Sequence, residues 1–247
     1  MTAANPTVDS SAPGILNRVL NDGVSLRTGK SGLPPDVEGA AYDTRAAAYD
    51  RVVGSALYNR LLWGLPVSRY HSFVNQALND NPGPLLDAGA GSAVFTADAY
   101  VQADRPLLLV DRSRDMLNAA RDRLSNRAGG SVPDHVTLLQ ADLNTLPLRP
   151  NSVDTILSMG MLHLFADPVA HVRTLLDGLA PGGSLFATSL VAERTIGRLY
   201  LRLLHRAGEV ASPRTYDALH EQLSTGLDAH VDGTRTGSMA FLTISSS

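Results

Sequence analysis

The sequence predicts an α/β fold built on a doubly wound, mostly parallel sheet with helices on both faces. From residue 84 onward, apolar runs of strand length alternate with segments of helical periodicity. The run at 84–88 leads into a glycine turn, Gly89-Ala90-Gly91, and then into a helical segment. At 247 residues, 44% of them hydrophobic, the chain is long and apolar enough for one large domain with a full core.

The elements can be placed in order along the chain. The expected strands cover 84–88, 107–111, 135–140, 152–158 and 183–190, and the expected helices lie near 94–103, 113–127, 168–179 and 193–207. Ser113 suits a helix N-cap, and Pro168 suits a first helical turn. A helix at 213–223 follows. Two alternating segments, 227–234 and 238–245, then flank a turn at Gly237. They predict an antiparallel pair that completes a seven-stranded sheet.

The segment before the sheet divides in two. Residues 1–40 contain four prolines and five glycines with little periodicity, which predicts a flexible N-terminal arm. The alternative is an arm that folds over a ligand or across a partner subunit. Within it, Ile15 to Leu20 has room for one or two helical turns. Residues 41–82 return to apolar residues at helical spacing, with a break at Gly64-Leu65-Pro66 and a second helix from Ser68 to Leu78.

Composition excludes several classes of protein. The chain has no cysteine, so disulfides, thiolate metal sites and a cysteine nucleophile are impossible within it. The net charge of −3 gives no reason to expect nucleic acid as a partner. The N-terminus lacks the pattern of a secretory signal, and no apolar run reaches the ~20 residues that a membrane span needs. We therefore expect a cytoplasmic protein.

The glycine turn is the first motif that bears on function. Gly89 and Gly91 let a ligand approach the backbone closely, although an ordinary strand–turn–helix corner can also use two glycines. A dinucleotide fingerprint needs a third glycine at position 94, where Val94 stands. Asp87 would also repel a pyrophosphate. The pattern Asp87-x-Gly89-x-Gly91-x-Ala93 instead suits a ligand with a cationic centre and an amino-acid tail.

Three further motifs follow at the expected strand ends. Asp111 closes the second strand, twenty positions after Gly91, where a carboxylate can accept both ribose hydroxyls; the alternative is a helix cap. Gln140-Ala141-Asp142-Leu143 closes the third strand, and the alternative for Asp142 is a plain turn residue. The fourth strand delivers Ser158 and Met159 to the same edge.

Taken together, the four motifs resemble those of the class I S-adenosylmethionine (SAM) methyltransferases, over roughly Tyr42 to Leu242. The chain is most similar to the small-molecule branch, which includes the ubiquinone/menaquinone-type C-methyltransferases. The resemblance implies a Rossmann-like core at 83–247, with a substrate-facing helical insertion near 193–223 and a helical lid at 41–82. It also implies SAM as cofactor and S-adenosylhomocysteine (SAH) as product.

The resemblance also assigns roles to cofactor-binding residues. It places the Asp87–Gly91 loop against the methionine portion of SAM and Asp111 on the ribose. Arg112 lies against the adenine edge and Met116 below it. The Asp142 carboxylate and the Leu143 amide meet the adenine, and Ser158 and Met159 line the same pocket. Tyr49 and Tyr58 contact the SAM carboxylate or sulfonium, unless they serve only in helix packing.

The chemistry that follows from the resemblance is methyl transfer to a small, apolar metabolite. An acceptor with a pKa above 7 needs a base, and His163, just after the fourth strand, is the candidate; the alternative is a neutral packing histidine. No metal is expected, because the loop after the fourth strand offers only Asp167. We expect a monomer or homodimer. Two other functions compete: a SAM- or SAH-binding protein that catalyses cyclisation or rearrangement or acts as a pathway partner, and a nicotinamide-dependent dehydrogenase, which Val94 disfavours.

Overall fold

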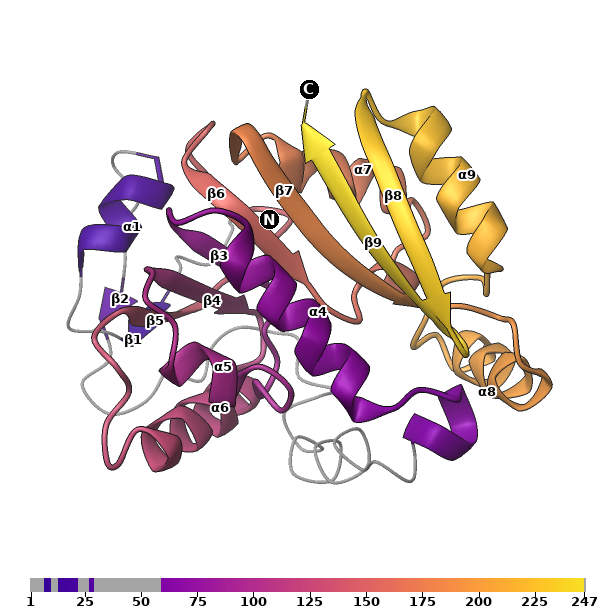
Figure 1. The fold of residues 1–247 in the computed structure, drawn as a ribbon, viewed down its shortest axis with the longest axis horizontal. Coiled ribbons are helices and arrows are strands. Elements are labelled where there is room, and N and C mark those ends of the chain that lie inside the picture. The colour runs from indigo at the N-terminus through magenta and orange to yellow at the C-terminus, as the bar shows by residue number, and fades with distance from the viewer. Residues whose placement is uncertain (1–6, 10–12, 22–26, 29–58, 247) are drawn as a thin grey trace.

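The computed structural model describes residues 7–9, 13–21, 27–28 and 59–246. Within these residues, nine strands form one sheet in the order β2-β1-β5-β4-β3-β6-β7-β9-β8 (Figure 1). The strands are β1 (Thr7–Asp9), β2 (Arg27–Thr28), β3 (Leu85–Ala88), β4 (Leu107–Asp111), β5 (Val136–Gln140), β6 (Val153–Ser158), β7 (Leu179–Leu190), β8 (Ala229–Thr236) and β9 (Met239–Ser246).

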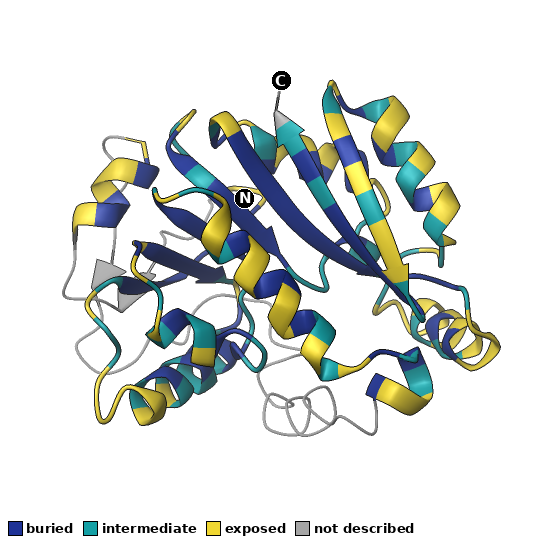
Figure 2. Cartoon of the chain, in the orientation of Figure 1, coloured by how far each residue is buried: buried dark blue, intermediate teal, exposed yellow. Residues whose placement is uncertain are grey.

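Helices pack on both faces of this sheet. They are α1 (Pro13–Val19), the π-helix η1 (Asn59–Trp63), α4 (Val67–Asp80), α5 (Ala97–Val101), α6 (Arg114–Arg127), the 3₁₀ helix η2 (Leu162–Leu164), α7 (Pro168–Leu176), α8 (Thr195–Arg206) and α9 (Tyr216–Gly226). One core cluster joins the sheet to α1, α7 and α9, and a second joins it to α4, α5, α6 and α8. Figure 2 shows the consequence: the central strands are mostly buried, while the helices are buried only along one side. No helix within the described ranges combines the length and the apolar character needed to cross a bilayer.

The predicted doubly wound sheet is confirmed. Strands β5, β4, β3, β6 and β7 are parallel neighbours, and β9 pairs antiparallel with both β7 and β8. Strand β9 contributes side chains to both core clusters, so both of its faces are covered. Met239, Ala240, Phe241, Leu242 and Ile244 are all buried. This explains why the segment alternates only weakly between polar and apolar residues.

The N-terminal segment differs from a free arm where the structure describes it. Strand β1 pairs antiparallel with β5, which adds two short strands to the seven that were expected. Leu16, Val19 and Leu20 are buried in the core beside the sheet. Segments this short carry too little periodicity to be predicted. The rest of residues 1–40, and the predicted helical segment up to residue 58, lie outside the described residues. The second helix of that segment is confirmed as α4.

Helix α5 is shorter than predicted. The expected helix covered 94–103, whereas α5 spans Ala97–Val101. Ala93 has a left-handed backbone, with φ at 56°, and Gly91 has φ at 53°. A right-handed helix cannot include such residues, and turns continue over 94–96, so the helix begins three residues later than predicted.

Candidate cofactor site at the carboxyl edge of the sheet

Four parallel strands bring the predicted motifs to one edge of the sheet. β5, β4, β3 and β6 are consecutive neighbours, so the residues that follow them share the carboxyl edge. The glycine turn follows β3, Asp111 ends β4, Gln140 ends β5 and Ser158 ends β6. In open α/β sheets this edge is where ligands bind.

The two glycines of the turn have different surroundings. The N–H groups of Gly89 and Ala90 donate to the Val110 carbonyl at 2.9 and 3.0 Å, which fixes the turn against β4. A Cβ added at Gly89 would lie 2.5 Å from the Met161 sulfur, whereas one added at Gly91 would meet no atom of the described residues within 4 Å. Gly89 is therefore needed for packing, and Gly91 faces open space where a ligand can approach.

Asp111 connects the glycine turn to helix α6. Its Oδ2 accepts the Gly91 N–H at 2.8 Å, and its Oδ1 accepts the Ser113 N–H at 2.8 Å. Burial raises the pKa of Asp111, and these two backbone hydrogen bonds act in the opposite direction. Each carboxylate oxygen has a further lone pair, so both can still accept a hydrogen bond from a ligand. This geometry fits a pair of ribose hydroxyls beside Gly91.

Asp87 is buried between helix α5 and Asp111. Its Oδ2 accepts the Tyr100 hydroxyl of α5 at 2.7 Å, and its side chain is buried. Burial raises the pKa of Asp87 to about 7, and the charge of Asp111 helps to raise it, although the Tyr100 hydrogen bond lowers it. The structure thus gives Asp87 a partner inside the protein, and its role toward a cofactor stays a prediction. Tyr100 carried no motif that sequence reasoning could have used.

The residues predicted to surround the adenine lie around the ends of β4 and β5. Arg112 is exposed, and its carbonyl accepts the Gln140 side-chain amide at 3.1 Å. Met116 is buried, with its N–H capped by Ser113 Oγ at 3.2 Å. Asp142 forms a turn in which its Oδ1 accepts from Asn144 N at 2.9 Å, and Leu143 is buried.

Two buried polar atoms at this edge have no hydrogen-bond partner. They are Gln140 Oε1 at the end of β5 and Ser158 Oγ at the end of β6. A buried acceptor or hydroxyl without a partner costs about 1–3 kcal/mol. Elsewhere in the described chain only Thr96 Oγ1 and His171 Nε2 share this condition. Both atoms lie at the predicted ligand edge. A polar molecule bound there could form hydrogen bonds with them and remove this cost.

The loop after β6 covers the glycine turn. Met159 is half-buried against the core, and Gly160 N–H donates to Thr188 Oγ1 of β7 at 2.7 Å. This hydrogen bond orients the loop so that Met161 packs over Gly89. Sequence reasoning missed both Met161 and Thr188, because neither the apolar residue nor the strand threonine departs from an ordinary pattern.

His163 lies in η2 with its ring turned toward β7. Its Nδ1 accepts the Leu190 N–H at 3.4 Å, and burial lowers its pKa to about 4. The imidazole is therefore neutral at pH 7, and the proton sits on Nε2 when Nδ1 is the acceptor. Ser189, Leu190, Leu201 and Val210 line a small cavity beside it. In this state the Nε2–H of His163 can donate a hydrogen bond, whereas the ring is a weak base.

Two predicted site residues cannot be placed. Tyr49 and Tyr58 lie outside the described residues. Their contact with the SAM carboxylate or sulfonium stays a prediction.

Comparison with known proteins agrees with this geometry. Residues 86–187 match the methyltransferase domain family, and this range contains every motif at the sheet edge. The chain is 28% identical over 136 residues to the ubiquinone/menaquinone biosynthesis C-methyltransferase UbiE of Idiomarina loihiensis, covering 52% of this chain and 53% of that protein. The matched part spans between 28% and 53% of the length of the curated relatives.

Solved structures agree on the fold. One chain in the complex between the Haloferax volcanii Trm112 methyltransferase activator and a methyltransferase has a TM-score of 0.63 at 15% identity, covering 83% of this chain and 97% of that one. The [4+2]-cyclase SpnF has a TM-score of 0.61 at 18% identity, covering 87% and 98%. Similarity at these identities shows the fold alone, and it confirms the predicted Rossmann-like class.

Proposed function

We propose that the chain, whose residues 86–187 match the methyltransferase domain family, transfers the methyl group of SAM to a small, apolar metabolite. One observation carries the proposal: Asp111 lies directly against Gly91, whose Cα faces open space. This arrangement holds a carboxylate where two ribose hydroxyls can reach it. The same open backbone admits an amino-acid tail.

The residues at the edge fit the cofactor. Asp111 would hold the ribose, Asp142 and Leu143 would meet the adenine, and the glycine turn would hold the methionine portion. SAM supplies an electrophilic methyl group on a positively charged sulfur. The protein therefore has to position the acceptor, exclude water and accommodate the acceptor's proton.

Apolar and polar side chains together line the space beside His163, which has a volume of only about 10 Å³. Leu190, Leu201 and Val210 line the small cavity there, and this cavity lies next to the loop that covers the glycine turn. We propose that His163 acts through its Nε2–H, which can polarise an acceptor oxygen, and that the acceptor enters already ionised or loses its proton to solvent. Replacement of His163 by alanine is expected to lower turnover more than SAM affinity. Equal turnover would return His163 to a packing role.

Calorimetric titration with SAM, SAH and NAD tests the cofactor. Micromolar binding of SAM or SAH without NAD binding supports the proposal and justifies a screen of small apolar acceptors by mass spectrometry. A chain that binds NAD but neither SAM nor SAH would overturn it.

A second function is favoured by the state of His163. A neutral imidazole with a pKa of about 4 is poorly suited to removing a proton, so the site also suits a reaction that needs no base. SpnF, which shares the fold, is a [4+2]-cyclase. Product mass separates the two functions, because methylation adds a methylene unit to the acceptor whereas cyclisation leaves the mass unchanged.

A further inference from the structure

Helix α8 carries two adjacent exposed rows of opposite character. Four large apolar side chains are strongly exposed in the described chain, and three of them belong to α8: Ile196 at 60%, Leu199 at 58% and Leu203 at 60%. The fourth, Leu61 at 62%, lies on η1, which contacts α8. These positions recur at helical spacing, so they form one apolar row. A cluster of this kind marks an interaction surface.

An arginine row runs beside the apolar one. Arg198, Arg202 and Arg206 recur every four residues and are exposed, and with His205 they line a groove of about 540 Å³ between α8 and residues 212–215. Helix α8 contains no acidic residue. None of the ion pairs found among the described residues involves these three arginines. The guanidinium groups are therefore uncompensated on a chain whose net charge is −3.

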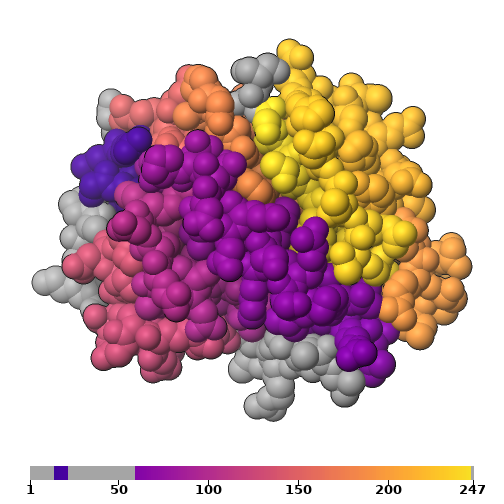
Figure 3. All heavy atoms as spheres, in the orientation of Figure 1, coloured from indigo at the N-terminus to yellow at the C-terminus, as the bar shows by residue number. Residues whose placement is uncertain are grey.

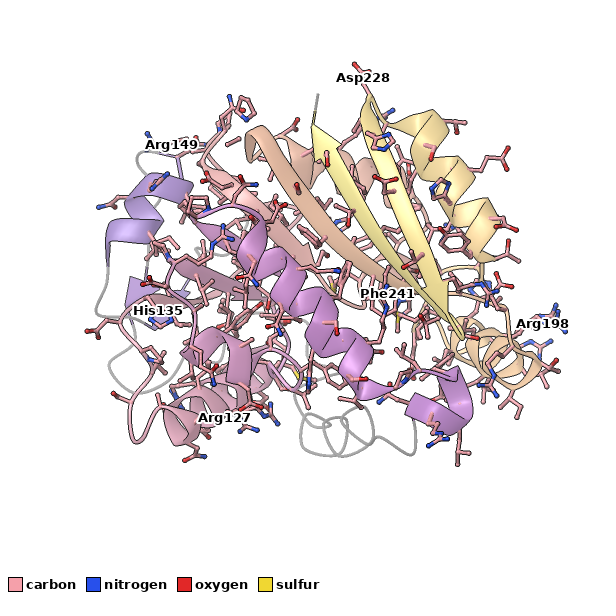
Figure 4. The ribbon with its side chains drawn as sticks, viewed as in Figure 1. Arg127, His135, Arg149, Arg198, Asp228 and Phe241 are labelled. Atoms are coloured by element: carbon pink, nitrogen blue, oxygen red, sulfur yellow. The ribbon has the colours of Figure 1, made fainter. Side chains whose placement is uncertain are left out.

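The position of α8 leaves both rows open to a large partner. Figure 3 shows α8 in orange at the rim of the molecule, beside the violet atoms of η1 and α4. The Arg198 side chain points outward from the helix (Figure 4). On the inner side, Gly197 and Leu201 are buried, and Tyr200 packs edge-on against Trp63 with ring centroids 5.8 Å apart. The helix is thus anchored on one side and free on the other.

From these rows we infer that α8 docks on an anionic membrane surface. An interfacial helix places its apolar side chains ~5–10 Å into the headgroup boundary while its cations meet lipid phosphates. The apolar row and the arginine row match those two layers. A second copy of the chain is a poorer occupant, because a symmetric contact would bring the same cationic row close to itself. Nucleic acid would satisfy the arginines but leave the leucines uncovered.

The inference has a consequence for how an acceptor arrives. Helix α8 begins soon after β7 ends, at the carboxyl edge of the sheet that holds the candidate site. A bilayer beneath α8 would supply apolar molecules to that edge. The docking itself does not depend on methyl transfer. Vesicle binding tests the docking and cofactor titration tests the proposed function, so either proposal can fail without the other.

Vesicle flotation of the full chain tests the docking. We expect binding to phosphatidylcholine vesicles that contain phosphatidylglycerol, and not to phosphatidylcholine alone, with weaker binding at high salt. Replacing Arg198, Arg202 and Arg206 by glutamine should weaken binding about a hundredfold. Replacing Ile196, Leu199 and Leu203 by serine should weaken it at least about tenfold. Emission of the single tryptophan, Trp63, reports whether each variant keeps the α8 packing.

A matched control removes three charges from another helix. Arg114, Arg121 and Arg127 lie on α6 near Asp115, Asp122 and Asp98, and their replacement by glutamine should leave vesicle binding unchanged. Three results would overturn the inference. They are no binding of the unaltered chain to phosphatidylglycerol vesicles, equal loss in the α6 control, and complete release by soluble glycerol phosphate, which would assign the groove to a small anion.

Discussion

Asp111 illustrates how one side chain can serve the fold and the ligand together. Its two oxygens hold the backbone of Gly91 and of Ser113, so the carboxylate links the glycine turn to the start of α6 before any ligand arrives. A cofactor that binds Asp111 therefore meets a group whose position is already fixed. Such preorganisation removes part of the entropy cost of binding.

Replacing Asp111 by alanine should lower both SAH affinity and stability. Loss of two hydrogen bonds to a charged group is expected to weaken SAH binding about a hundredfold or more. The Gly91 and Ser113 amides lose their acceptor, which should cost about 1–3 kcal/mol of unfolding free energy. Calorimetry and urea unfolding measure the two effects.

Two further variants make the Asp111 test specific. Asp111→Asn keeps one acceptor oxygen and should fall between alanine and the unaltered chain in SAH affinity. Asp122→Ala removes an exposed carboxylate from α6 and should change neither quantity. Unchanged SAH affinity in Asp111→Ala would remove the ribose assignment.

Ala93 occupies a position where glycine would be free of strain. Its φ of 56° lies in the left-handed region, and its side chain is buried. For a residue with a Cβ this conformation costs roughly 1–2 kcal/mol, and a β-branched side chain makes it worse.

We expect Ala93→Gly to leave stability within about 1 kcal/mol of the original, because relief of strain is offset by the flexibility of glycine and the lost methyl contact. Ala93→Val should destabilise by about 2 kcal/mol or more. The control Ala119→Val, within helix α6, should cost about 0.5 kcal/mol. If urea unfolding gave Ala93→Val and Ala119→Val the same loss of stability, the backbone of Ala93 could not be strained.

At the scale of elements, one buried arginine joins α4 to the sheet. Arg105 is 5% exposed and donates to the carbonyls of Gly83, Ala77 and Leu78 at 2.7 to 3.2 Å. It also donates to Thr155 Oγ1 of β6 at 3.0 Å. A planar guanidinium can meet acceptors on several sides at once, which the single ammonium of lysine cannot. The end of α4 is therefore held against β6 through Arg105.

Arg105→Lys is expected to lower the unfolding free energy by about 2–4 kcal/mol, since several buried carbonyls lose a charged donor. Arg206→Lys, on the exposed side of α8, should have no measurable effect on stability. Urea unfolding of the two variants provides the comparison. Equal midpoints would mean that the carbonyls find other donors.

The elements also show where sequence reasoning succeeds. Strands β3, β4, β5 and β6 are mainly apolar runs between clear turns, so their bounds were predicted to within a residue. The segment of β9 was expected to alternate, whereas a strand covered on both faces lacks the alternation that fixes register. Strands β1 and β2 have too few residues to carry a pattern.

Within the candidate site, sequence reasoning could identify only the residues that directly follow the ends of strands. Asp111 and Gly91 could be paired because their spacing reflects the turn and the next strand. Tyr100 and Met161 meet the site through tertiary packing, which leaves no mark on local spacing. The neutral state of His163 depends on its burial against β7, and no sequence pattern reports that.

At the scale of the whole molecule, charge is distributed unevenly. The net charge is −3, yet the exposed side of α8 presents three uncompensated arginines. The titratable groups with the largest shifts lie inside, where burial disfavours their charged forms. Burial lowers the pKa of His163 and of His171 to about 4, and it raises the pKa of Asp87 to about 7. These groups link folding stability to pH in opposite directions.

The sign of that linkage gives a testable pH profile. Between about pH 4 and 6.5, unfolding lets His163 and His171 each take up a proton, while Asp87 loses the one it holds in the folded chain. For these three groups the net uptake of one proton means that stability should rise with pH by about 1.4 kcal/mol per pH unit. The raised pKa of Asp111 adds one proton released on unfolding, which lowers this slope at the acidic end of the window. From about pH 6.5 to 7 only Asp87 still contributes, and stability should fall slightly.

Two variants should change that slope in opposite directions. Asp87→Asn removes the proton released on unfolding, so the slope between about pH 4 and 6.5 should double, and the decline above 6.5 should vanish. His171→Gln removes one proton taken up, so the slope should approach zero. The His171 ring stacks on Phe165 with centroids 3.7 Å apart. Urea unfolding at several pH values measures the slopes. If Asp87→Asn leaves the slope unchanged, the carboxyl must ionise normally in the folded chain, and the hydrogen bond from Tyr100 must be strong enough to offset its burial.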